Sequence, residues 1–231
     1  MGSAAGGLDP WMERPSLEYQ HAFDCCAVEL QRVAGPVTVV ASHPFYAREL
    51  LKRLDGCHVS LVLAPDWNLP AEEISRWLGY DVARSSIESD PGVGAQAQAA
   101  VWAEPQREVG EEILERIGRT VRPGGQLYVV ASGWLRRFLP EWQRGAVLAG
   151  QEPAGLRAAT RWLRAAGWHV ERPYGFHGPR SVCWGLAAHG AARLARLDCA
   201  DLCHFGMRAA YVVHGWQASL APVTVVTARK G

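Results

Sequence analysis

The chain lacks any long apolar run, and it has almost no surplus of charge of either sign. No stretch of about 18 apolar residues, the length a membrane-spanning helix needs, occurs in the sequence. Its 24 lysines and arginines face 23 aspartates and glutamates, which leaves a net charge of +1. The composition therefore predicts no broad surface for nucleic acid or an anionic membrane, and we expect neither as a partner, although local basic patches stay open.

Regular cysteine spacing is also missing. The six cysteines form no disulfide framework, and residues 1–7 lack the basic and apolar regions of a secretory signal, so we expect reduced thiols in a cytoplasmic protein. Cys199 and Cys203 would share one face of a helix, but His204 would point about 100° away from Cys203. This spacing matches no standard zinc pattern, and we expect no metal site.

Several glycine motifs of enzymes are absent as well. The sequence contains no Gly-x-Ser-x-Gly elbow, no phosphate-binding Walker loop and no Gly-x-Gly-x-x-Gly turn. These absences disfavour an α/β-hydrolase, a P-loop nucleotidase and a dinucleotide-dependent dehydrogenase.

Short apolar runs that alternate with helical patterns are what the chain does contain. Residues 37–41 and 59–64 are runs typical of strands buried on both faces, with a helical pattern between them. The order strand, helix, strand predicts a parallel sheet, and the whole chain predicts a doubly wound α/β fold with a mostly parallel, seven-stranded sheet. The expected strands are residues 37–41, 59–64, 81–87, 97–102, 126–131, 168–171 and 223–227.

Helical patterns fill the remaining segments. An N-terminal lead and helix should occupy residues 1–34, and one domain should occupy residues 35–231. Between the last two strands we expect a helical insertion at about residues 178–215, whose second helix carries Leu202, Phe205, Ala209 and Val212.

The strand order also predicts where a ligand binds. In doubly wound sheets the ligand crevice lies beyond the carboxyl ends of the strands. That edge should gather the residues that follow or end the first five strands, which are Ser42, His43, Pro65, Asp66, Glu88, Trp102, Ala103, Ser132 and Gly133.

Residues 111–130 resemble the class I S-adenosylmethionine-dependent methyltransferases, of the type 11-like kind. In that family a helix ends in an Arg-Pro-Gly-Gly-like turn and runs into the fifth strand, as residues 122–125 do here. Residues 162–168 resemble the helix and the Ala-Gly-aromatic turn before strand six, and residues 223–229 resemble the last strand. The resemblance implies a Rossmann-like methyltransferase sheet, S-adenosylmethionine as cofactor and a small-molecule acceptor. It also implies that Ser42, His43, Asp66, Glu88 and Trp102 contact the cofactor.

The first loop departs from this family. After strand one the family has a glycine-rich turn, whereas residues 41–46 here contain no glycine and include Pro44, Phe45 and Tyr46. Two hypotheses therefore stay open: methyl transfer with an altered cofactor loop, or a catalytically inactive binding or scaffold protein in which Phe45 and Tyr46 fill the cofactor space. His43 and Asp66 also fit a plain helix cap and a plain turn residue.

Residues 174–180 form the most site-like loop. Two glycines and a proline shape it, and Tyr174 and His177 are the candidate catalytic residues because phenol and imidazole groups transfer protons. A structural turn whose histidine bonds only backbone is the alternative. Arg136, which lies among aromatic residues, is expected in a solvated amphipathic segment rather than on a nucleic-acid surface.

Overall fold

The computed structural model describes residues 17–33, 35–41, 44–63, 85–87, 96–138, 153–195 and 211–231. Within these residues nine strands form one sheet, whereas seven were expected. The strands are β1 (Val37–Ala41), β2 (Val59–Leu63), β3 (Ser85–Ile87), β4 (Ala97–Ala103), β5 (Val121–Ser132), β6 (Trp168–Val170), β7 (Tyr174–Phe176), β8 (Val212–His214) and β9 (Val223–Lys230). The helices are α1 (Leu17–Gln31), α2 (Pro44–Arg53), α4 (Gly110–Thr120), the 3-10 helix η3 (Trp134–Phe138), α6 (Leu156–Ala165), α7 (Pro179–Ala195) and α9 (Trp216–Leu220).

The sheet has the mostly parallel, doubly wound order that the sequence predicts. Its order is β3-β2-β1-β4-β5-β9-β7-β8, with β6 pairing β9 beside this path. The first five strands of this order are parallel, and β9 runs antiparallel to β5. All five residues of β1 are buried, as expected for a strand covered on both faces.

Two additional strands explain the difference in number. Residues 174–176, expected to be a loop, form β7, and Val212, expected in a helix, begins β8. β6 and β7 pair with successive parts of β9, so they are the two halves of one interrupted strand. Pro173 lies in the interruption, where its lack of an N–H prevents a continuous ladder.

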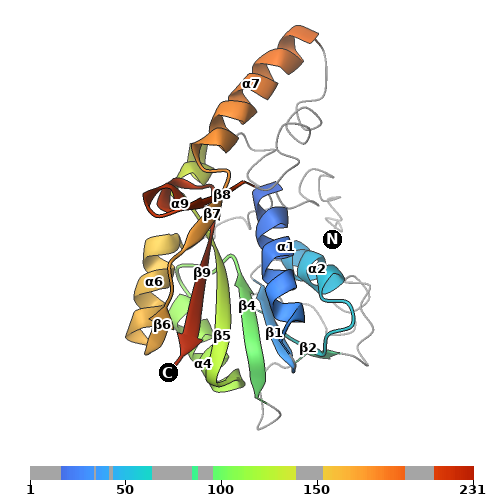
Figure 1. Ribbon diagram of the computed structural model, residues 1–231, viewed down its shortest axis with the longest axis vertical. Helices are drawn as coiled ribbons and strands as arrows, with labels where there is room; N and C mark the ends of the chain where they lie inside the picture. Colours follow the sequence, from blue (N-terminus) through green and yellow to red (C-terminus); the bar gives the residue numbers. More distant parts are fainter. Residues whose placement is uncertain are drawn as a thin grey trace, which may run out of the picture.

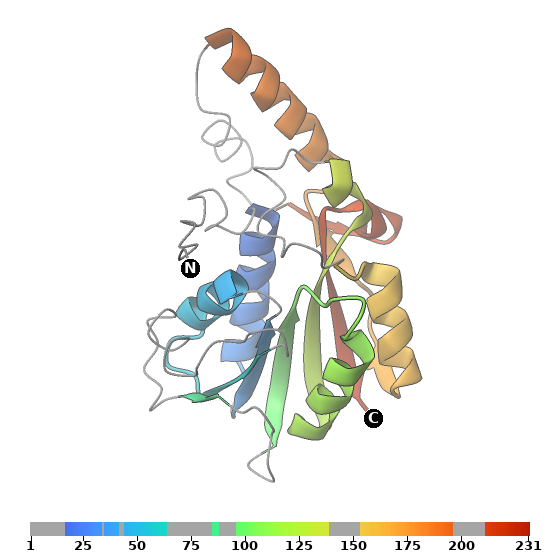
Figure 2. The ribbon, with the colours of Figure 1, turned by 180° about the vertical axis from the view of Figure 1, so that it is seen from behind.

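Helices cover both faces of the sheet, as Figures 1 and 2 show from opposite sides. α1 and α2 pack on one face, where Tyr19, Phe23 and Tyr46 join the core. α4 and α6 pack on the other face, where Trp102 and Trp162 join a second core. α7 projects away from the body of the molecule in both views. No helix in the described part of the chain is long and apolar enough to span a membrane.

The Arg-Pro-Gly-Gly segment belongs to β5 rather than to a turn that precedes it. Val121 pairs with Ala97, and the ladder resumes with Gln126 opposite Ala99, so the residues between them bulge. Gly124 has a φ of +75°, and a Cβ on Gly125 would lie 2.6 Å from Val121 Cγ1. Glycine is required at both positions, which is why this segment is recognisable in the sequence.

A close backbone contact also requires glycine at position 133, directly after β5. A Cβ at this position would overlap the backbone carbonyl of Ala221, whose oxygen cannot move without shifting the chain before β9. We expect Gly133→Ala to lower the free energy of unfolding by about 3 kcal/mol, the upper range for overpacking. Urea unfolding at equilibrium measures this change.

Gly118→Ala is the matched control for that substitution. Gly118 lies inside α4, and nothing lies within 4 Å of a Cβ built on it. Alanine should therefore stabilise the protein by up to about 1 kcal/mol through helix propensity. Equal effects of the two substitutions would contradict the packing described for Gly133.

Candidate functional site

A buried polar cluster lies at the carboxyl edge of the sheet. Glu104 directly follows β4, Ser132 ends β5, and Arg136 comes from η3. Tyr46 comes from the first turn of α2, just after β1, and Tyr19 comes from the first turn of α1. We call these five residues the Glu104–Arg136 cluster. Five elements of the fold thus converge where doubly wound sheets bind ligands.

Arg136 is at the centre of the hydrogen bonds. Its Nη1 forms an ion pair with Glu104 Oε1, donates to Ser132 Oγ, and lies 3.0 Å from Tyr19 Oη. Tyr19 Oη donates to Glu104 Oε1 over 3.0 Å. Arg136 Nη2 reaches Tyr46 Oη at 3.5 Å. The expectation that Arg136 is solvated was wrong, because Arg136 is only 5% exposed.

Burial sets the protonation states of the cluster. It raises the pKa of Tyr19 and Tyr46 well above the usual value for a phenol, so both keep their protons at neutral pH. Burial alone would lower the pKa of Arg136, but the Glu104 carboxylate beside it raises that pKa above its ordinary value. The cluster thus holds a charged guanidinium and two phenolic donors.

Burial of a cluster that contains an ion pair costs free energy. Removing two ions from water costs several kcal/mol per ion. The attraction between the two ions offsets this cost only when their geometry is good. The backbone at Glu104 is also unusual, because this non-glycine residue has a φ of +52°. Charged groups and left-handed backbone collect at functional sites more often than elsewhere. These features make the cluster the candidate site.

A second group of polar side chains joins α1 to β7. His177, which follows β7, is 1% exposed and has a φ of +60°. Its Nε2 lies 2.8 Å from Nδ1 of His21 in α1. Tyr174 Oη lies 3.4 Å from Cys25 Sγ, one turn further along α1. The structure therefore brings the two predicted catalytic residues, Tyr174 and His177, against one helix.

Their protonation states differ from those of ordinary catalytic acids and bases. Burial, with His21 and Arg180 nearby, lowers the pKa of His177 to about 4, so its imidazole is neutral at pH 7. His177 Nδ1 is buried and has no hydrogen-bond partner among the described residues. Burial, with Cys26 as the next cause, raises the pKa of Tyr174, so its phenol stays protonated and can act as a donor.

The lowered pKa of His177 predicts a pH-dependent stability. Because the folded pKa lies below the ordinary value of about 6.5, folding favours the neutral ring. The stabilisation should be complete above pH 6.5 and should be lost as the pH falls toward about 4. Urea unfolding between pH 7.5 and pH 4.5 should show this decrease.

His177→Asn is the test substitution for this dependence. Asparagine tolerates a positive φ and does not titrate, so it should remove most of the slope that the wild type shows in this range. An unchanged slope would mean that other groups cause the dependence.

Trp102, predicted to contact a cofactor, lies on the opposite face of the sheet from Tyr174. Its side chain is 1% exposed and packs beside Trp162 of α6, with the ring centroids 6.4 Å apart. Its Nε1 is buried with no hydrogen-bond partner in the described part of the chain. These are the surroundings of a core residue, and its contact with a cofactor stays a prediction.

The other predicted cofactor contacts, Ser42, His43, Asp66 and Glu88, lie outside the described residues. So do Cys199, Cys203 and His204. Within the described ranges, no group of three or more histidine, cysteine, aspartate or glutamate side chains is arranged to hold a metal ion.

Comparisons with known proteins give the fold its name. No protein-family model matches the chain, and no curated protein matches its sequence. Among solved structures, the crystal structure of the [4+2]-cyclase SpnF is similar, with 17% identity and a TM-score of 0.52 over 90% of this chain and 81% of that one. Geranyl diphosphate C-methyltransferase from Streptomyces coelicolor A3(2) is similar with 13% identity and a TM-score of 0.51, over 92% of this chain and 79% of that one.

Some similar structures are much longer than this chain. An O-methyltransferase family protein from Burkholderia thailandensis shares 10% identity with a TM-score of 0.47, and the match covers 92% of this chain but only 57% of that one. Identities this low identify the fold alone, and one fold hosts different reactions, as the names cyclase and methyltransferase illustrate. The chain has the fold of the class I S-adenosylmethionine-dependent methyltransferases.

Proposed function

We propose that the protein binds S-adenosylmethionine and transfers its methyl group to a small-molecule acceptor. The observation that carries this proposal is the Glu104–Arg136 cluster: a charged cluster, buried at the carboxyl edge of a class I methyltransferase sheet. Such a cluster adds little net stability to a core, so its position at the edge where doubly wound sheets bind ligands favours a role in binding.

The described residues fit one part of this cofactor chemically. The methionine part of the cofactor carries an ammonium and a carboxylate. Glu104 offers a carboxylate for the first, and Arg136 offers a guanidinium for the second. In our proposal Ser42, His43, Asp66, Glu88 and Trp102 contact the remainder of the cofactor.

When bound, the cofactor would supply an electrophilic methyl group on a sulfonium. The task of the protein is then mainly to orient the acceptor and to exclude water. We assign Tyr174 as a hydrogen-bond donor because its phenol stays protonated. We assign His177 as the proton acceptor, since its neutral ring keeps an unpartnered Nδ1. The pKa of about 4 makes this imidazole a weak base, so it would serve acceptors that need little help in losing a proton.

A small-molecule acceptor suits the overall charge of +1, which gives no general attraction to nucleic acid. The similar enzyme from Streptomyces coelicolor is named for a small molecule, geranyl diphosphate, which supports the same class here. The test is to incubate the protein with methyl-labelled cofactor and a cell extract divided by ultrafiltration into small molecules and macromolecules. Label in a product made from the small-molecule fraction is expected. Label confined to macromolecules would overturn the acceptor class.

One observation favours a second function, that of a binding or scaffold protein without the cofactor. Tyr46, which the sequence places beside the cofactor loop, is fully buried and stacks on Tyr19 with ring centroids 4.8 Å apart. The side chain of Phe45 lies outside the described residues. If the Tyr46 ring occupies the cofactor space, the cofactor cannot bind, although the fold stays intact.

A further inference from the structure

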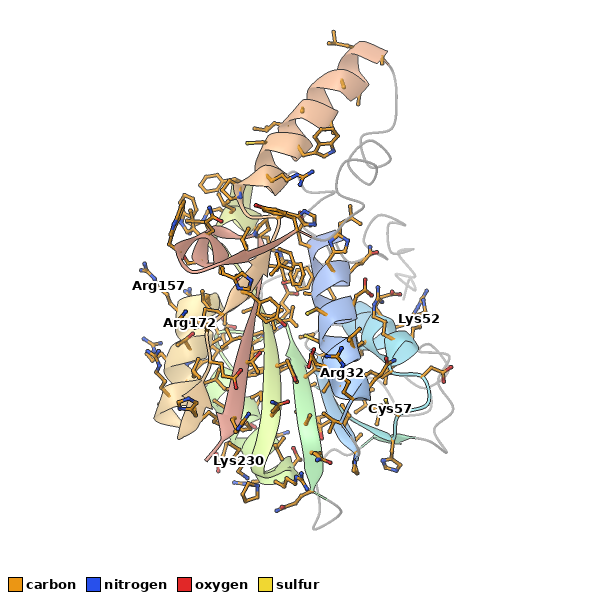
Figure 3. All side chains as sticks on the ribbon, in the orientation of Figure 1. Arg32, Lys52, Cys57, Arg157, Arg172 and Lys230 are labelled. Carbon is orange, nitrogen blue, oxygen red and sulfur yellow. The ribbon has the colours of Figure 1, made fainter. Side chains whose placement is uncertain are left out.

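Large apolar side chains are exposed at the end of the molecule that holds the carboxyl edge of the sheet. They come from η3, α7, α9 and residues 211 and 212 at the start of β8, which lie together at one end in Figures 1 and 2. Figure 3 shows side chains extending outward from these elements. We call this set the aromatic end; its members are Trp134, Phe138, Trp184, Leu186, Leu194, Tyr211, Val212 and Trp216. Trp216 is 70% exposed and Leu194 is 90% exposed, which is unusual for such large apolar groups.

Among the described residues of the aromatic end, the charged side chains are all basic. None of the residues described at 134–138, 177–195 and 211–220 is acidic, although the whole chain is nearly neutral. Arg137 and Arg180 are exposed there. The Arg137 guanidinium lies 5.0 Å from the centre of the Trp134 ring, and that of Arg180 lies 5.6 Å from the centre of the Tyr211 ring. These arginines would therefore attract an anionic partner, and none of these residues carries a carboxylate that would repel it.

α7 has the composition of a helix that is normally buried. Its 17 residues include no acidic residue, and large apolar or small residues stand on several sides of it. A helix that is apolar all round is normally buried, but α7 projects from the body and exposes Leu186 and Leu194. Something apolar should cover it in the working state of the protein.

A second copy of the chain would suit the apolar side chains but not the charge. Pairing two aromatic ends would bring arginines together with no carboxylate among these residues to compensate them. Nucleic acid would suit the arginines and the aromatic rings, but it gives no reason for exposed leucines on a projecting helix. A membrane surface with anionic lipids satisfies both requirements, because arginines attract the headgroups while tryptophan and leucine enter the interface.

Although the overall charge of the chain predicts no membrane partner, we propose that the aromatic end, as a local basic patch, docks the protein on an anionic lipid surface. η3 connects this surface with the Glu104–Arg136 cluster, since Arg136 belongs to the cluster and its neighbour Arg137 is exposed beside Trp134. Docking would thus place the carboxyl edge of the sheet next to the lipid. The proposal does not depend on methyl transfer, because a protein without the cofactor would dock in the same way.

The experiment is flotation of the full chain with vesicles of phosphatidylcholine alone or with 30% phosphatidylglycerol. We expect the protein to float with the anionic vesicles at 0.1 M salt and to bind them much less at 0.5 M salt, where screening is strong. Arg137→Glu with Arg180→Glu should reduce the partition coefficient roughly 30-fold or more, since each basic residue near the surface contributes about fivefold.

Arg161→Glu with Arg164→Glu is the matched control, because both arginines are exposed on α6, away from the aromatic end. It changes the net charge equally and should lower binding far less. A third variant, Leu194→Ser with Trp216→Ser, should weaken binding with no change of charge. Circular dichroism checks that every variant is folded.

Three results would overturn the proposal. The first is no flotation with anionic vesicles. The second is an equal loss of binding in the control and in the Arg137 and Arg180 variant. The third is a dimer in light scattering that both serine substitutions dissociate, without any binding to vesicles, because the covering of α7 would then be a second copy of the chain.

Discussion

Arg136→Met is expected to lower the free energy of unfolding by about 3–5 kcal/mol, which is the cost of leaving one partner of a buried ion pair alone. Glu104, which is 5% exposed, would lose its guanidinium partner and keep the hydrogen bond from the Tyr19 hydroxyl. Methionine retains most of the volume of arginine, so packing contributes little to this loss. Urea unfolding at pH 7 measures it.

The double variant separates the charge from the packing. Adding Glu104→Gln removes the uncompensated carboxylate, and much of the lost stability should return. Glu112→Gln with Arg116→Met is the control, because that pair is exposed on α4 with its atoms 2.6 Å apart. Exposed pairs contribute at most about 1 kcal/mol, so the control should change little. An Arg136→Met effect as small as that of the control would contradict the buried ion pair.

Tyr46→Ala is expected to cost about 3–5 kcal/mol, the usual range for removing a buried aromatic ring. Tyr46 is fully buried, stacks on Tyr19 and meets Phe23 edge to face, with ring centroids 5.7 Å apart. Phe23→Ala is the matched control, since Phe23 lies in the same core but comes from α1. Thermal and urea unfolding give both values.

Tyr46→Ala also separates the two functions. If the Tyr46 ring occupies the cofactor space, the variant should bind S-adenosylhomocysteine more tightly than the wild type, and Phe23→Ala should not. If the crevice is open in the wild type, neither substitution should raise the affinity. A gain that is specific to Tyr46→Ala would favour the scaffold function and contradict methyl transfer by the natural chain.

Much of the fold was predictable because the sequence patterns that specify its strands and helix ends lie within short segments of the chain. β1, β2 and β9 are short β-branched apolar runs, and such runs form strands buried on both faces. The end of α6 was equally clear, since Gly167 adopts a φ of +78° directly after it. The interrupted β6 and β7 were missed in part because three-residue strands carry too few residues for a period to show.

Tyr19, Glu104 and Arg136 of the cluster were missed for a different reason, whereas Ser132 and Tyr46 were expected beside the pocket. Tyr19 and Glu104 are 85 residues apart in the chain, and Arg136 is 117 residues from Tyr19. Each of them looks ordinary beside its own neighbours, and Arg136 lies between Trp134 and Phe138 on a short amphipathic segment. One signal was available: Glu104 is an acidic residue two positions after the fourth predicted strand, at the edge where ligands bind.

The measurement that tests the central claim most directly is calorimetric titration of the wild type, Glu104→Gln and Glu112→Gln with S-adenosylhomocysteine. We expect the wild type and Glu112→Gln to bind with equal affinity, and Glu104→Gln to bind at least about tenfold more weakly, since it loses one charge-assisted hydrogen bond to the ammonium group. No heat of binding to the wild type at millimolar ligand, or equal binding by all three proteins, would contradict a cofactor held at the Glu104–Arg136 cluster.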